Sequence, residues 1–186
     1  MIGYIFFGLV ALLLVFGVSI YNRLIKNRNL VQEAWSGIDV QFKRRSDLIP
    51  NLLEAVKGYM GHERGVLDHV TELRTQSRQA GSVGEKARTE GMLGAALGNL
   101  LAVAENYPDL KASQNFLELQ RSLADIEEQL QLARRYYNGA ARDFNILIGS
   151  FPSNLIAQKF NFQPVEYFEI EAPGDRDLPR VSFPGN

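Results

Sequence analysis

The apolar positions of the chain form two different patterns, and the first is continuous. Ile2 to Tyr21 reads IGYIFFGLVALLLVFGVSIY and contains no charged side chain. About 20 helical residues at a rise of about 1.5 Å each cover about 30 Å, the hydrocarbon thickness of a bilayer. A soluble helix is rarely apolar on every face over such a length. We therefore predict a transmembrane anchor at residues 1–22, which contacts the lipid bilayer through residues 2–21.

The residues around the anchor indicate its orientation. A cleaved signal peptide is the alternative, but Val18-Ser19-Ile20 makes a poor cleavage site and no basic region precedes the apolar stretch. Arg23, Lys26 and Arg28 follow the stretch directly. The positive-inside rule then predicts a single-pass protein with a short N-terminus outside the cell and its C-terminal domain in the cytoplasm.

The second pattern is periodic, with apolar residues that recur three and four positions apart. The longest run begins at Phe116 and ends at Phe151. Others cover residues 31–42, 49–73 and 93–107. A mean spacing of about 3.5 residues is typical of knobs-into-holes packing in coiled coils and helical bundles. We predict an all-α fold, in which the anchor is followed by an antiparallel up-and-down four-helix bundle of long helices over residues 23–160.

Several breaks in the pattern indicate where the helices end. Ser46-Asp47 and Pro50 suit the first turn of a new helix, although a kink in one continuous helix is the alternative. Residues 80–84, with the sequence AGSVG, predict a loop. Pro108 ends the third helix, and Ser113 is a suitable N-cap for the fourth.

The last part of the chain differs from the bundle in composition. Residues 161–186 contain four prolines, which predict an extended tail. Within it only residues 166–170 resemble a short strand. The tail is suited to strand addition or groove docking.

Glycines interrupt the helical segments at helical spacing. Gly61 and Gly65 are four residues apart, as are Gly94 and Gly98. Each costs a helix about 1 kcal/mol relative to alanine. We expect them to allow close packing within the bundle, and a groove for a partner is the alternative interpretation.

The composition of the chain excludes several kinds of binding and catalytic site. The 20 Lys and Arg residues balance 21 Asp and Glu residues, which argues against a nucleic-acid binder, and the absence of Cys excludes thiolate chemistry. His62-Glu63 begins a sequence like HExxH, but Val66 stands where zinc binding needs the second His. Neither His follows a Glu by three residues, as a di-iron bundle requires. We therefore expect no enzymatic activity, metal or cofactor.

A polar set at helical spacing remains. Glu127, Arg134, Asn138 and Asn145 lie near one stripe of the last long helix, beside its apolar seam. A buried polar network or a partner contact is our interpretation, and a ligand-binding or catalytic site is the alternative. The full candidate set is Arg45, Asp47, Glu63, Glu105, Glu127, Arg134, Asn138 and Asn145.

Several motifs, in order along nearly the whole chain, resemble the LemA family of bacterial membrane proteins. They include VQFKRRSDLIPNL at residues 40–52, ENYPDLK at 105–111, the Arg and Tyr-Asn of residues 134–138, YFE at 167–169 and RVSF at 180–183. The resemblance implies one span in the bacterial inner membrane and a cytoplasmic helical bundle without established enzymatic activity. Phe42, where Leu is usual, and Ser113, where Asn is usual, depart from the pattern.

The resemblance also implies a kind of function. Relatives include a magnetosome membrane protein and proteins associated with membrane metalloproteases. We expect a membrane-anchored scaffold that binds other proteins at the cytoplasmic face, with a membrane metalloprotease among the candidate partners. The alternatives are a membrane-shaping homo-oligomer, and a small-ligand binder or enzyme that uses the Glu, Arg and Asn set.

Overall fold

The computed structural model describes residues 1–60 and 63–169 of the chain. The described residues form helices and no strand. The helices are α1 (Ile2–Lys57), α2 (Arg64–Gln79), α3 (Val83–Ala104), α4 (Pro108–Lys111), α5 (Gln114–Gly149) and α6 (Ser153–Lys159).

One continuous helix joins the apolar N-terminal stretch to the bundle. α1 is 56 residues long, and its N-terminal part is long and apolar enough to cross a membrane, with none of that window buried. Pro50 lies inside α1, so of the two possibilities that the sequence leaves open, a new helix at Ser46 or one continuous helix, the structure has the continuous helix. The reason is visible at the Ser46 carbonyl, which the missing N–H of Pro50 leaves without its helical partner. This carbonyl accepts a hydrogen bond from Arg74 Nε of α2, at 2.8 Å.

The first turn between long helices lies between Lys57 and Arg64, inside a segment that the sequence pattern places in one helix. The periodic run of residues 49–73 predicts one helix, but α1 ends at Lys57 and α2 begins at Arg64. Ser82 is the N-cap of α3, and its side chain and that of Glu85 form a reciprocal capping box.

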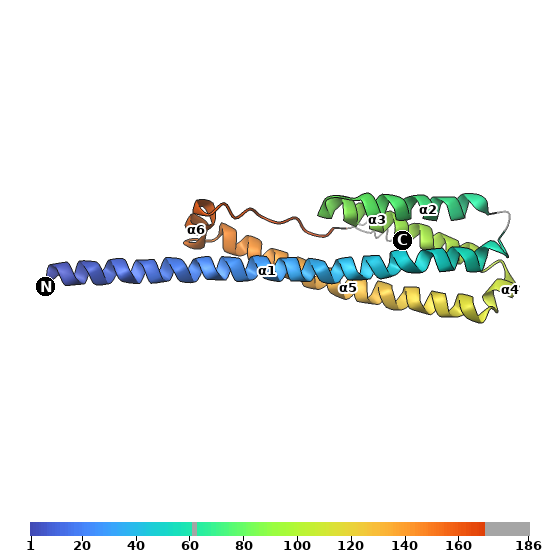
Figure 1. Ribbon diagram of the computed structural model, residues 1–186, viewed down its shortest axis with the longest axis horizontal. Coiled ribbons are helices and arrows are strands. Elements are labelled where there is room, and N and C mark those ends of the chain that lie inside the picture. The colour runs from blue at the N-terminus through green and yellow to red at the C-terminus, as the bar shows by residue number, and fades with distance from the viewer. Residues whose placement is uncertain (61–62, 170–186) are drawn as a thin grey trace, which may run out of the picture.

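The four long helices run alternately away from and toward the N-terminal end, as Figure 1 shows. α1 and α5 form a long antiparallel pair, and α2 and α3 form a shorter antiparallel pair that lies beside the half of the bundle farther from the N-terminus. The predicted all-α class and up-and-down bundle are confirmed. α6 packs against both α5 and α1.

The core has two parts, and the tail completes one of them. The distal part lies among all the long helices and includes Leu52 and Leu100. In the part nearer the N-terminus, α6 and residues 161–169 pack beside α1 and α5, and Ala87 from the start of α3 joins them (Figure 1). Phe162 and Phe168 of the tail are buried there.

The tail forms no strand within the described residues. Residues 163–169 have no regular secondary structure, so the prediction of a strand at 166–170 is not met over its described part. Residue 170 lies outside the described residues, as do His62 and the RVSF motif at 180–183. Hydrogen bonds from α5 side chains, described below, replace the pairing that a second strand would supply.

Candidate functional site

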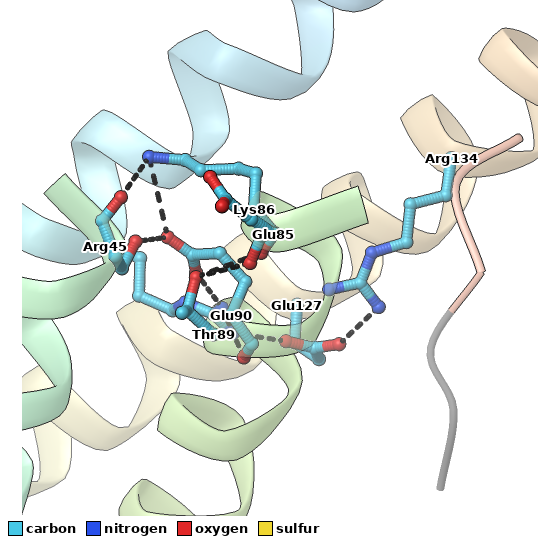
Figure 2. Close-up of polar contacts among 8 residues, drawn as sticks. Arg45, Glu85, Lys86, Thr89, Glu90, Glu127 and Arg134 are labelled. Carbon is cyan, nitrogen blue, oxygen red and sulfur yellow. Dashed lines mark hydrogen bonds and ion pairs between the residues drawn. The ribbon is translucent and has the colours of Figure 1, made fainter. Parts of the chain in front are cut away.

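Charged residues from three helices meet at the boundary between the two parts of the core. Arg45 of α1, Glu90 of α3, and Glu127 and Arg134 of α5 lie together in Figure 2. Arg45 donates from Nη1 to Glu127 Oε2 at 3.0 Å, and from Nη2 to both the carboxylate and the carbonyl oxygen of Glu90. Arg45 and Glu90 are only 3% and 2% exposed. This burial makes their pairing a structural requirement, since an isolated buried charge is strongly unfavourable.

The Glu90 carboxylate has two further partners besides Arg45. The Ser77 hydroxyl donates to its Oε1 atom, and Lys86 Nζ lies 4.0 Å from the same oxygen. Lys86 also donates to the Ser77 carbonyl at 2.8 Å, which connects α2 with α3. Arg45 and Glu90 therefore join α1, α2 and α3 through one buried hydrogen-bond network.

Sequence reasoning missed Glu90, although the sequence carries a signal for it. Ala87, Glu90, Leu93, Leu97 and Leu100 continue the buried seam of α3 at spacings of three and four. A carboxylate at a seam position predicts a buried cationic partner. Arg45 occupies the equivalent place on α1, between the buried Phe42 and Ile49.

Arg134 lies at the edge of this network, next to the tail. Its Nη1 atom is 3.5 Å from Glu127 Oε1, and its guanidinium carbon is 5.2 Å from the ring centre of Phe168. Its Nε atom is buried and has no hydrogen-bond partner among the residues that the structure describes. Burial lowers the pKa of Arg134, and the negative charge of Glu127 partly opposes this shift.

Asn138 and Asn145 do not join the ion network but bind the backbone of the tail. Asn138 donates to the Phe168 carbonyl at 3.0 Å and accepts from the Phe168 N–H at 2.8 Å. Asn145 makes the same pair of bonds with Val165, both at 2.9 Å. Between them the Tyr137 hydroxyl donates to the Glu166 carbonyl at 2.8 Å. Burial raises the pKa of Tyr137, and the charge of Glu166 adds to the shift.

The remaining predicted residues lie elsewhere. Asp47 and Glu105 are exposed, and Glu63 is the half-exposed residue that precedes α2. The membrane-flanking cations are exposed on α1; among them Arg28 packs its guanidinium carbon 5.4 Å from the ring centre of Phe162. Among residues 1–60 and 63–169, no group of three or more His, Asp and Glu side chains is placed to hold a metal ion.

A groove of about 470 Å³ opens beside the ion network, between α3 and α5. One wall carries Gly91, Gly94 and Gly98, and the ion network closes one end. The rest of the lining is Leu97, Leu101, Gln120, Leu123 and Ala124. Gly98 is exposed, and a Cβ atom added to it would meet no atom of the described residues within 4 Å. A Cβ atom added to Gly94 would lie 3.6 Å from Nη1 of Arg45, which is an ordinary contact with a side chain. Gly94 and Gly98 therefore line the groove rather than a tight contact between helix backbones, and the binding of a partner there stays a prediction.

The chain resembles known proteins over the whole of this region. The LemA family model matches residues 34–183. The chain belongs to the LemA family. Arg45, Glu90, Glu127, Arg134 and the two asparagines of the tail contact all lie inside the matched part.

Individual relatives include a magnetosome protein and a protein named for the family. The chain is 28% identical over 184 residues to magnetosome protein MamQ 2 of Paramagnetospirillum magneticum, covering 85% of this chain and 68% of the relative. The corresponding MamQ of Magnetospirillum gryphiswaldense is 25% identical with the same coverage. Protein LemA of Metamycoplasma hominis is 28% identical over 175 residues, covering 88% of this chain and 78% of the relative.

Proposed function

We propose that this LemA-family chain is a single-pass inner-membrane protein that binds the helix of a partner protein in the groove between α3 and α5, without catalysing a reaction. The observation that carries the proposal is the open, glycine-walled groove, held in place by the buried Arg45–Glu90 pair. The bundle would present this groove at the cytoplasmic face of the membrane.

The membrane part of the proposal rests on α1. No residue of its apolar window is buried, and such apolar exposure is unfavourable in water and favourable in lipid. Arg23, Lys26 and Arg28 follow the window and are exposed, which favours a cytoplasmic bundle by the positive-inside rule. A fluorescent protein fused to the C-terminus, which fluoresces only in the cytoplasm, tests this orientation. A dark but membrane-inserted fusion protein would contradict it.

The shape of the groove fits a helix. Gly91 to Leu101 span about 15 Å of α3, which is close to three turns of an α-helix. Glycines let two helix backbones approach closely, and Leu97, Leu101 and Leu123 supply the apolar surface that an amphipathic helix would cover. Arg134, whose bond to Glu127 is long at 3.5 Å, offers donors to a carboxylate at one end of the guest helix.

Site-specific photo-crosslinking in cells tests the groove. A photoreactive amino acid at Gln120, which is exposed and lines the groove, should capture a defined partner that mass spectrometry identifies. Gly98→Leu should abolish this product because its side chain fills the groove. Gly37→Leu is the matched control, since Gly37 is an exposed helical glycine with open space around it and lies outside the groove.

The outcome separates the candidate partners. A product that needs the open groove supports the proposal, whether the partner is a membrane metalloprotease or another protein. A product that consists of a second copy of this chain would favour the homo-oligomer. Equal crosslinking in the Gly98→Leu and Gly37→Leu backgrounds, or none from Gln120, would refute the groove as a partner site.

A small amphipathic ligand is a second candidate, because the groove combines apolar walls with a charged end. A thermal-shift screen of amphipathic carboxylates against the wild type and Gly98→Leu tests it. Stabilisation of the wild type alone would favour a ligand site over a helix site.

A further inference from the structure

A second stretch of the chain is poor in charge. Residues 144–165, which include the end of α5 and all of α6, contain Lys159 as their only charged residue. This stretch does not have the length of apolar sequence needed to cross a bilayer, because Pro152 and several polar residues interrupt it. Its position in the fold gives it a different role.

α6 lies beside the last turns of the apolar part of α1. A Cβ atom placed on Gly17 would lie 3.9 Å from Cδ1 of Ile156, and the Tyr21 ring packs against the Phe160 ring at an angle of 57°, with centroids 4.7 Å apart. Gly17 precedes Tyr21 by four residues, or about 6 Å along the helix. If residues 2–21 cross the bilayer, α6 is therefore level with the region where acyl chains meet headgroups.

Large apolar side chains at this end of the bundle face outward. Phe151 is 80% exposed, and Ile146, Leu155 and Phe160 are each more than half exposed. These four residues lie along the end of α5 and along α6, and exposed apolar groups of this size are unfavourable in water. Ile146 and Phe151 line one cleft together with Phe16 and Ile20, so this surface adjoins the apolar part of α1.

The cleft between α1 and this surface has a mixed character. It measures about 350 Å³ and is lined by Phe16, Ile20 and Phe151 together with Arg23 and Asp143. Apolar and charged groups side by side suit the boundary between hydrocarbon and headgroups, where amphipathic side chains place their two ends in different surroundings.

We propose that the α5–α6 corner, residues 146–160, is a second membrane-contact surface that inserts Phe151, Leu155 and Phe160 into the bundle-side leaflet. Its depth would be about 5–10 Å, as for helices that lie in the interface. Lys159 ends α6 and would reach the headgroups. Together with α1 this surface would hold the bundle at a fixed orientation on the membrane. The inference rests on the proposed membrane anchor and adds a contact that a single span does not provide.

Depth-dependent fluorescence quenching tests the inference on the full chain. The chain has no Cys, so single cysteines can carry an environment-sensitive dye. We would label Leu155→Cys and, independently, Phe151→Cys, and reconstitute each protein into nanodiscs of zwitterionic and anionic phospholipids. The nitroxide quencher is placed either near the headgroup or near the end of the acyl chain.

Two control positions make the result specific. Leu12→Cys lies near the middle of the apolar stretch, and Leu132→Cys is an exposed apolar position of α5, about 21 Å of helix from Ile146. We expect strong quenching of the dyes at Leu155 and Phe151 by the headgroup nitroxide, stronger quenching at Leu12 by the chain-end nitroxide, and none at Leu132.

Each other result has a definite meaning. Quenching at Leu12 with none at Leu155 and Phe151 would overturn the second contact and leave the anchor intact. No quenching at Leu12 would refute the anchor itself. Equal quenching at Leu132 and Leu155 would show that the bundle lies flat on the membrane and would overturn the specific role of the α5–α6 corner.

Discussion

The side-chain amide of Asn138 forms two hydrogen bonds with the backbone of Phe168, donating to its carbonyl and accepting from its N–H. Asn145 repeats the arrangement with Val165. Seven residues of α5 span about 10.5 Å, and three residues of extended chain span about 10 Å. The two asparagines therefore match the repeat of an extended tail that runs antiparallel to α5, and they set its register much as a neighbouring strand would.

Loss of one asparagine should release part of the tail. Asn138→Ala removes two hydrogen bonds, each worth about 1 kcal/mol, and should weaken tail docking by about 2 kcal/mol. Hydrogen exchange at the Phe168 amide should accelerate accordingly. Asn115→Ala, at an exposed position of the same helix, is the control and should leave this exchange unchanged. Unchanged protection in Asn138→Ala would contradict the assigned contact.

The buried ion pair should be intolerant of losing one partner. Glu90→Gln leaves Arg45 buried with less compensating charge and should lower the free energy of unfolding by roughly 3 kcal/mol. Glu54→Gln, which breaks an exposed pair with Lys57, should change it by about 0.5 kcal/mol or less. Chemical denaturation in detergent measures both.

A double variant separates pairing from burial. Arg45→Met with Glu90→Leu removes both charges and should recover most of the stability lost in Glu90→Gln, because an apolar pair has no charge to desolvate. A double variant less stable than Glu90→Gln would show that the geometry of the network, rather than charge compensation, dominates there.

Gly98 should be replaceable by alanine with a gain in stability. Alanine is favoured over glycine in a helix by about 1 kcal/mol, and a Cβ atom at this position meets nothing within 4 Å. Gly37→Ala should give a similar gain, since that position is equally open. A loss of stability in Gly98→Ala alone would mean that α3 and α5 approach more closely at the groove than the structure indicates.

Alkaline pH should weaken the contact between α5 and the tail through Tyr137. Its pKa is raised in the folded protein, so the neutral phenol is the form that folding favours. The stabilisation is fully present below the ordinary tyrosine pKa of about 10 and is lost as the pH rises through the higher folded value. The unfolding midpoint should therefore fall less steeply above pH 10 in Tyr137→Phe than in the wild type.

The neighbouring residue is the matched control for this experiment. Tyr136 is exposed and Tyr136→Phe should keep the alkaline decline of the wild type. If the unfolding midpoints of both variants fall equally above pH 10, this fall arises from groups other than the Tyr137 phenol.

The sequence by itself determined the features that local pattern controls. The apolar stretch of residues 2–21 follows from composition alone. The seam of α5 from Phe116 to Phe144 follows from the spacing of apolar residues, because residues three and four positions apart lie on the same face of a helix. The spacing of Glu127, Arg134, Asn138 and Asn145 marked one polar side of α5. Family membership followed from motifs that keep their order along the chain.

Tertiary structure decided what each of these groups contacts. Pro50 stays inside α1, and the Ser46 carbonyl that it leaves without a helical partner accepts a hydrogen bond from Arg74 of α2. Sequence spacing does not predict that α2 lies next to this carbonyl. Glu90 pairs with Arg45 across 45 residues, and Asn138 reaches a tail 30 residues away. Helical periodicity shows which face of a helix a residue occupies. The partner on that face depends on how helices pack side by side, and this packing is settled by the energy of burying and pairing groups from distant segments.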